Sequence, residues 1–352
     1  MSAVIASTNI LCSIGRGSEQ VWASARAGIA RIGSSQVMDR YLAPIQMGLV
    51  PEDALGHLSP EIETLPLPSR ARRLLRLAVP ALQGLELQGR DSTPGGAGPV
   101  RMFLGLPEFA PQDSAWLNHF LRYLDMLSAV PIDLERSVIV PHGRAAALMA
   151  LEQALDALAS DPEAPVIVGG VDTHLDLRLL SSLDTEQRLL GARVMDGFIP
   201  GEGAAFLALS AAQPQAGGSR VQVNAAASIA DQGHRYGTEP ARGEGLSAAI
   251  EELRARLESP LPPVGVTFAG FNGENFDAKL WGVAQLRHRD FFAPAMLIEH
   301  PADKYGDAGA ATGAILTAMA AAALSDGSRN GPALVWAASD REPRACALLS
   351  IA

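Results

Sequence analysis

VIVGGVDTHLDLRLLSSLDTEQRLLGARVMDGFIPGEGAAFLAL, residues 166–209, is the stretch that decides the fold. Residues 166–168 are apolar and β-branched and stop at Gly169-Gly170, which predicts a short buried strand that ends in a turn. Asp172 and Thr173 are candidate caps of a helix, because leucines then recur at helical spacing. The stretch therefore begins with a strand, a turn and a helix.

The second part of this stretch carries a bend and another buried strand. Asp196-Gly197-Phe198 leads to Pro200-Gly201-Glu202-Gly203, which neither a helix nor a strand accommodates, and residues 204–209 are apolar. Both parts resemble the β-ketoacyl synthases, condensing enzymes of the thiolase fold, which have a GGVD-type turn after a central strand and a DGF-x-PGEGA segment before the next one. The resemblance implies an α/β, thiolase-like fold of two pseudo-symmetric βαβ halves in a five-layer αβαβα arrangement.

The resemblance covers most of the chain and implies its division into two halves. We expect an N-terminal half over residues 1–212 and a C-terminal half over residues 213–352, joined by a small linker at residues 213–219. Two helices rich in Ala and Gly, at residues 143–159 and 309–324, should pack between the sheets. Family members are usually homodimers, so we expect an isologous homodimer through an edge strand around Val166.

Composition limits the classes of function. The chain has 352 residues, of which 48% are hydrophobic, and a formal net charge of −10, which does not favour nucleic acid or an anionic membrane as partner. Its two cysteines, Cys12 and Cys346, are far apart, and no metal-ligand spacing occurs. No basic region precedes an apolar run at the N-terminus. We therefore expect a cytoplasmic protein with no metal and no cofactor.

The largest departure from the family lies where its nucleophile belongs. In condensing enzymes a strand ends at a cysteine that starts a long buried helix, whose N-terminus stabilises the thiolate. Here residues 138–147 read VIVPHGRAAA, with an apolar helix pattern after them and no cysteine nearby. His142 falls within a residue or two of the expected position. An imidazole can be acylated, so His142 is either an atypical catalytic residue or a polar filler of the space of a thiol.

The two histidines that the family uses are also replaced. One belongs to an HGT segment after a strand, where Gly270 follows the predicted strand at residues 264–268. The other precedes a GAA segment, where Asp307 stands instead. An ionised carboxylate cannot donate a hydrogen bond to an oxyanion. The Gly-rich loop before the last strand has become Ser-Asp-Arg-Glu-Pro-Arg at residues 339–344. The sequence thus predicts a degenerate catalytic set at His142, Gly270 and Asp307.

Several other polar residues are candidates for binding. Phe198, Asn272 and Glu274 are candidate substrate-binding residues together with His142; Asn272 and Glu274 alternatively make a turn and cap the next helix. His174 and Asp176 are expected on a helix surface.

A basic amphipathic helix at residues 69–88, with Arg70, Arg72, Arg73 and Arg76, is either a docking patch for an acidic acyl carrier protein or a solvated face. Pro80 predicts a kink in this helix.

The function that follows from these departures is that of a non-catalytic β-ketoacyl synthase-like protein. It would act as a protein partner or scaffold, with or without a retained acyl pocket. Its candidate partners are a second copy, an acyl carrier protein, or a synthase with which it pairs as a chain-length factor does; an accessory role in a bacterial secretion cluster is a further alternative. The enzyme alternative is an acyltransferase or 3-oxoacyl synthase with an atypical site at His142, or a hydrolase with Asp307 as base.

Overall fold

The computed structural model describes residues 2–87, 98–109, 115–212 and 220–352. Their main sheet has two halves with the same strand order. The first half runs β6 (Val138–Val140), β5 (Arg101–Gly105), β7 (Val166–Thr173), β8 (Glu202–Ala211) and β1 (Ala3–Cys12). The second runs β11 (Phe292–Glu299), β10 (Val264–Ala269), β12 (Ala333–Ala338), β13 (Pro343–Ile351) and β9 (Val221–Ala230). The halves join where β1 pairs with β9.

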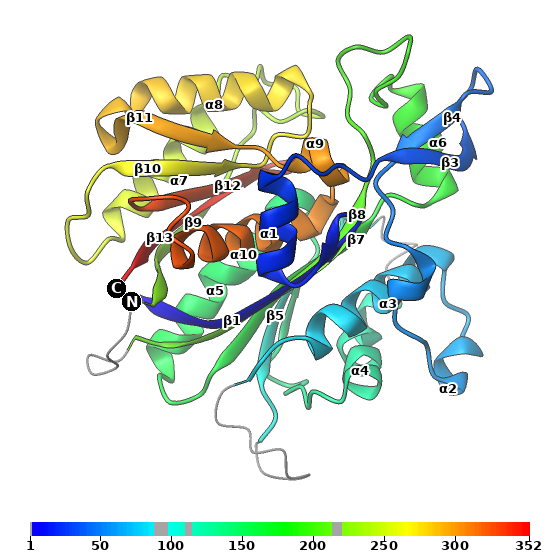
Figure 1. Ribbon diagram of the computed structural model, residues 1–352, viewed down its shortest axis with the longest axis horizontal. Coiled ribbons are helices and arrows are strands. Elements are labelled where there is room, and N and C mark those ends of the chain that lie inside the picture. Colours follow the sequence, from blue (N-terminus) through cyan, green and yellow to red (C-terminus); the bar gives the residue numbers. More distant parts are fainter. Residues whose placement is uncertain (1, 88–97, 110–114, 213–219) are drawn as a thin grey trace.

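The helices form three layers around the two halves of the sheet (Figure 1). The central layer is α5 (Ala146–Ser160) and α10 (Thr312–Ser325), and both contact strands of both halves. One outer layer contains α3 (Ser69–Gln83) and α4 (Leu117–Ser128), and the other contains α7 (Glu244–Ala255) and α8 (Asn275–Arg287). This is the predicted αβαβα thiolase-like arrangement. The boundary between residues 212 and 213 stays a prediction, because residues 213–219 lie outside the described residues.

Smaller elements complete the described chain. The short strand β2 (Gly15–Arg16) pairs with β1, and β3 (Gly33–Met38) pairs with β4 (Pro44–Met47) as a separate hairpin. The remaining helices are α1 (Ser18–Arg26), α2 (Pro60–Glu63), α6 (Leu177–Thr185) and α9 (Ala302–Tyr305). No helix in the described ranges is both long enough and apolar enough to cross a membrane.

Glycine allows the central helices to approach the sheet closely. A Cβ atom at Gly105, in β5, would lie 2.5 Å from the backbone nitrogen of Ala147 in α5. A Cβ atom at Gly170, in β7, would lie 2.6 Å from the carbonyl oxygen of Ala310 at the start of α10. The same close packing explains an error in the sequence prediction. The strand does not end at Gly169-Gly170 but continues to Thr173, because these glycines make room for neighbours rather than for a turn.

The predicted position of the dimer strand is wrong. β7 lies between β5 and β8 and is buried along its whole length, so the segment at Val166 offers no edge. The edges of the sheet are β6 in the first half and β11 in the second.

The predicted caps also differ. Asp176, rather than Asp172 or Thr173, caps α6, where its carboxylate accepts a hydrogen bond from the backbone N–H of Leu179 at 2.9 Å. Asp172 instead points toward α10.

The basic helix ends earlier than predicted and uses its arginines internally. α3 ends at Gln83, so Pro80 lies in its last turn. Arg70 pairs with Asp172 at 2.8 Å, and Arg73 pairs with the buried Glu202 at 2.6 Å. Two of the four arginines are therefore neither a free docking patch nor a solvated face.

Candidate functional site

The start of α5 is the position where the family resemblance places a nucleophile. Gly143 has φ of +68°, which favours glycine, and opens a turn of 3₁₀ helix over Gly143–Ala145. The side chain that enters the protein interior from this turn is Arg144, which is buried. His142 lies two residues earlier and its side chain is exposed. The structure thus places an arginine, not a histidine, at the inner end of this turn.

All three kinds of nitrogen in the Arg144 guanidinium have partners. Nη1 lies 2.6 Å from Asp307 Oδ2, Nη2 lies 2.5 Å from Asp340 Oδ1, and Nε donates to the carbonyl of Ala338 at 3.1 Å. Burial by itself would lower the pKa of Arg144, but Asp340 and Asp307 raise it well above its ordinary value. Arg144 is therefore a permanently charged cation with a partner at each of its three nitrogens.

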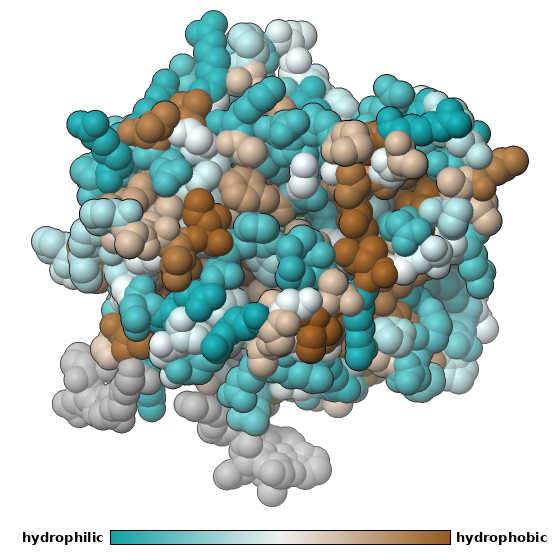
Figure 2. Space-filling model, turned by 45° about the horizontal axis from the view of Figure 1, so that its top comes forward, coloured by the Kyte–Doolittle hydropathy of each residue, from teal (hydrophilic) through white to brown (hydrophobic). Residues whose placement is uncertain are grey.

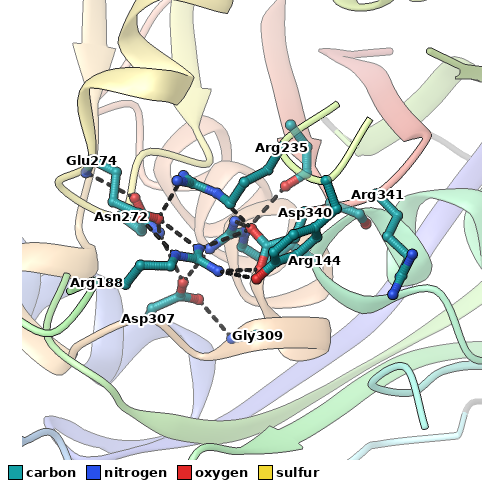
Figure 3. Close-up of polar contacts among 12 residues, drawn as sticks. Arg144, Arg188, Arg235, Asn272, Glu274, Asp307, Gly309, Asp340 and Arg341 are labelled. Atoms are coloured by element: carbon teal, nitrogen blue, oxygen red, sulfur yellow. Dashed lines mark hydrogen bonds and ion pairs between the residues drawn. The ribbon is translucent and has the colours of Figure 1, made fainter. Parts of the chain in front are cut away.

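Two more arginines join this network (Figure 3). Arg188, which follows α6, makes two hydrogen bonds to Glu274 at 2.9 and 2.8 Å and pairs with Asp340 at 2.8 Å. Arg235 pairs with Glu274 at 2.9 Å. The opposite charges, Glu274, Asp307 and Asp340, come from three separate loops of the second half of the chain. We call this set of three arginines and three carboxylates the ion-pair network.

The pKa values of four members of the network, Arg144, Arg188, Asp307 and Asp340, shift in the direction that keeps these residues charged. Burial would raise the pKa of Asp340 and of Asp307, yet Arg144 lowers both, with Arg188 acting on Asp340 and His174 on Asp307. Burial would lower the pKa of Arg188, but Glu274 and Asp340 raise it. These four charged groups are therefore not poised to exchange a proton near neutral pH.

The backbone donors of the two central helices are occupied as well. Ser339 Oγ accepts the N–H of Ala145 at 3.0 Å. At the start of α10, Asp307 Oδ1 accepts the N–H of Gly309 and Asp172 Oδ2 accepts the N–H of Ala310, both at 2.8 Å. These three N–H groups are therefore not available to stabilise an oxyanion.

The other predicted site residues are partly brought together. A Cβ atom at Gly270 would lie 2.8 Å from the carbonyl oxygen of Trp336, so this backbone has no room for the histidine of the family. Asn272 donates to Asp307 at 3.2 Å and to Glu274 at 2.8 Å, and its Oδ1 accepts the N–H of Glu274. Asn272 thus makes the predicted turn, whereas the side chain of Glu274 does not cap α8.

A polar cleft of about 350 Å³ opens beside the network. Its charged lining comprises Arg70, Arg144, Arg188 and Arg341 with Glu108, Asp172, Glu186 and Asp340. Phe198 also lines the cleft, where it lies under Arg188 at 5.3 Å from the guanidinium carbon. Tyr236 accepts a hydrogen bond from Arg188 at 3.0 Å and donates one to Glu186 at 2.7 Å.

His174 was expected on a helix surface, and this expectation is wrong. The residue is buried, lines the cleft and packs edge-on against Phe198. Its Nδ1 lies 3.2 Å from the carbonyl oxygen of Gly201, which can only accept, so Nδ1 carries a proton and donates it to this oxygen. The error arose because β7 continues to Thr173 and keeps the next residue inside the protein.

The cysteines lie elsewhere. Cys12 is buried at the end of β1, and burial raises its pKa to about 12. Cys346 is buried in β13, and burial raises its pKa as well. Neither cysteine lines the cleft, and the described part of the chain has no group of three or more potential metal ligands.

Asp277 is a buried carboxyl beside the network. It is 1% exposed, and neither of its oxygens has a hydrogen-bond partner among the described residues. Burial raises its pKa to about 7, and Glu274 and Asp340 act in the same direction. One proton on Asp277 therefore removes an unpaired negative charge from the interior.

No family model matches this sequence, and no curated protein does. Solved structures share its fold. The ishigamide ketosynthase/chain length factor has a TM-score of 0.71 and 17% identity over 100% of this chain and 99% of that chain. The ketosynthase from module 6 of the bacillaene synthase of Bacillus subtilis 168 has a TM-score of 0.76 and 13% identity over 99% of this chain and 72% of that chain. The AntDE:AntF complex, a type II PKS acyl-carrier protein bound to its ketosynthase, has a TM-score of 0.75 and 14% identity over 99% of this chain and 98% of that chain.

These similarities place the chain in a structural class. It has the thiolase-like fold of the ketosynthases, as the two sequence motifs predict. Within that fold, the start of α5 carries an arginine held by two carboxylates.

Proposed function

We propose that this chain is a non-catalytic ketosynthase-like protein that works as a protein partner or scaffold. The observation that carries the proposal is Arg144 at the start of α5. A guanidinium stays protonated and has no lone pair to attack a thioester. Its charge is committed to ion pairs with Asp307 and Asp340.

The surroundings of Arg144 support the same proposal. Gly270 cannot be replaced by a larger residue without moving its neighbours, and Asp307 has its charge committed to Arg144. The exposed position of His142 gives it no contact with the network. An acyltransferase at His142 would therefore act on the surface, outside the cleft.

The edge strand β6 supports a partner protein. Val138 in this strand is exposed, and so are Met126 and Leu134 in the segment that leads into it. An exposed, apolar sheet edge is a surface that another chain can extend. We propose pairing at β6, either with a second copy or, as in a ketosynthase/chain length factor pair, with an active synthase.

The proposal that the protein is non-catalytic is tested with acyl and malonyl thioesters of coenzyme A and of an acyl carrier protein. We expect no condensation product and no acylated protein in the mass spectrum. Condensation that disappears in His142→Ala would refute the proposal. An acyl adduct on His142 would establish the acyltransferase alternative.

Pairing at β6 is tested by the native mass of the purified protein, alone and with a candidate synthase. Val138→Asp should abolish assembly, and Leu286→Asp, at a more exposed apolar position on α8, should not. A stable homodimer that binds no synthase would argue against the chain-length-factor version.

A further inference from the structure

The tip of the β3–β4 hairpin is built as a rigid turn. Asp39 accepts the backbone N–H groups of Tyr41 and Ala43 on its Oδ1, both at 2.8 Å. Its own backbone binds Ala43 and Leu42 at 2.8 and 3.0 Å. The inner side of the hairpin is anchored, because Ile45 packs in one cluster with residues of α6. The outer side of the tip is therefore held in a fixed position.

Leu42 breaks the usual rule for such a turn. A three-residue hairpin loop ends with a residue in the left-handed conformation, which is normally glycine. Leu42 occupies this position with φ of +63°. The side chain gains no burial in return, since it is 84% exposed. A bulky apolar residue kept in an unfavourable conformation and in water indicates a use outside the chain.

A second loop adds to the same surface. Met195 is 85% exposed, and it and Leu42 are the most exposed large apolar side chains of the described residues. The guanidinium of Arg193 lies 4.2 Å from the centre of the Tyr41 ring, so the turn at residues 191–195 rests against the hairpin tip. Arg40 ties the tip to Asp184 of α6. Figure 2 shows apolar surface projecting at this end of the molecule.

The charge and shape of this surface limit what can cover it. Among the described residues, no carboxylate pairs with Arg193, whose recorded partner is the Tyr41 ring. The exposed positive charge suits a partner with carboxylates around its binding pocket. A symmetric contact between two tips would bring each Arg193 close to its equivalent in the second copy, and the two like charges would repel. The net charge of −10 opposes an anionic membrane.

We propose that the hairpin tip and the turn at residues 191–195 form a docking knob for a different protein, which presents an apolar pocket rimmed by carboxylates. Leu42 and Met195 enter the pocket, and Arg193 pairs with its rim. The inference deepens the proposed partner role and rests on it. The helix α6, against which the hairpin packs, also contributes Leu179 and Leu183 to the lining of the cleft, so a partner on the knob would sit near the cleft wall.

The test begins with a photo-crosslinker in cells of the native host. p-Benzoylphenylalanine is placed at position 42, at position 195 and, as a control, at position 286, where Leu286 is 76% exposed on α8. We expect one protein to be captured from positions 42 and 195 but not from 286. That protein is then purified, and its affinity for the full chain is measured.

Leu42→Asp and Met195→Asp should weaken binding at least tenfold, and Arg193→Glu should weaken it and remove most of its salt dependence. Leu42→Gly separates folding from docking: it should raise or preserve the melting temperature, because glycine favours the left-handed conformation, and still lose binding. Leu286→Asp should bind as the wild type does.

Several outcomes would overturn the knob. They are no capture at 42 and 195, capture of lipid or of a second copy, and an affinity that Leu42→Asp leaves unchanged. None of these results bears on catalysis, which the thioester assay tests separately. Conversely, condensation activity would refute the non-catalytic proposal. It would not account for a loss of binding in Leu42→Gly, so the docking proposal would still stand on its own measurement.

Discussion

The two central helices begin with the same backbone turn but carry opposite charges at their N-termini. α5 follows a 3₁₀ turn at Gly143–Ala145, and α10 follows one at Gly309–Ala311, with a positive φ at the first glycine of each. At α10 the turn has only small residues, Gly309, Ala310 and Ala311, and two carboxylates, Asp307 and Asp172, accept its N–H groups. At α5 the turn carries the buried cation Arg144.

This difference shows why the two halves depend on each other. A helix N-terminus favours negative charge, so the carboxylates at α10 are stabilising and a cation at α5 is not. Arg144 is tolerated there because Asp307 and Asp340 of the second half compensate it. The pair formed by Arg144 and Asp307 directly connects the starts of the two helices.

The most severe test of this connection is Arg144→Met. It leaves the buried Asp307 without its arginine and removes one of the three arginines that pair with the half-buried Asp340, so we expect a loss of about 3–5 kcal/mol in the free energy of unfolding at pH 7. Urea unfolding measures it. Arg341→Met, an exposed residue of the same loop as Asp340, should cost less than about 1 kcal/mol.

The pH dependence of this loss has a definite sign. Arg144 lowers the folded pKa of Asp307 and Asp340, so their contribution is present above their ordinary pKa near 4 and is lost as the pH falls through the folded values. The gap between wild type and Arg144→Met should therefore narrow toward pH 3. A gap that stays constant from pH 7 to pH 3 would contradict the ion-pair explanation.

The paired substitutions Gly309→Ala and Gly143→Ala test the two turns themselves. A Cβ atom at Gly309 would lie 2.0 Å from Asp172 Oδ2, whereas the nearest atom to a Cβ at Gly143 is Ser339 Oγ at 3.6 Å. We expect thermal or urea unfolding to show a loss of about 2–4 kcal/mol for Gly309→Ala. Gly143→Ala should lose only about 1 kcal/mol, from its backbone conformation. Equal losses in the free energy of unfolding would mean that the close carboxylate of Asp172 does not make Gly309 harder to replace than Gly143.

Asp277→Asn examines the carboxyl that has no partner. The folded pKa of Asp277, about 7, lies above its ordinary value of 3.8, so its contribution is fully present below about pH 4 and is lost as the pH rises to about 7. Asparagine does not titrate. The free energy of unfolding of the variant, relative to that of the wild type, should therefore rise by about 1–3 kcal/mol between pH 4 and pH 8, since a tenfold change in proton affinity is about 1.4 kcal/mol. Parallel stability profiles would refute this.

Asp172→Asn should have the smallest effect. One amide oxygen can still accept the N–H of Ala310, but the charge that pairs with Arg70 is lost, so we expect a loss of about 1 kcal/mol in urea unfolding. Asp176→Asn is the matched control at the start of α6, where asparagine caps as well as aspartate does. If Asp176→Asn lowers the free energy of unfolding as much as Asp172→Asn does, the ion pair with Arg70 does not contribute to stability.

Some of the site could be read from local sequence and some could not. The strand at residues 138–140 and the helix after it followed from apolar runs. Motif spacing predicts that Gly270 and Asp307 stand at the positions of the two family histidines. The sequence favours His142 over Arg144 at the start of α5, because only the direction of the turn decides which of the two side chains points inward. His174, Arg188 and Tyr236 have no local motif at all.

The sequence alone determined the thiolase-like arrangement, because apolar periodicity, small residues in two helices and glycine-bearing motifs are properties of neighbours along the chain. It also predicts that the catalytic residues of a condensing enzyme are missing. Only the tertiary structure decided what replaced them and which strands are edges. The ion-pair network joins residues from Arg144 to Asp340, and β7 is enclosed by strands formed before and after it in the chain. Contacts between segments so far apart depend on how the two halves pack, which no local pattern encodes.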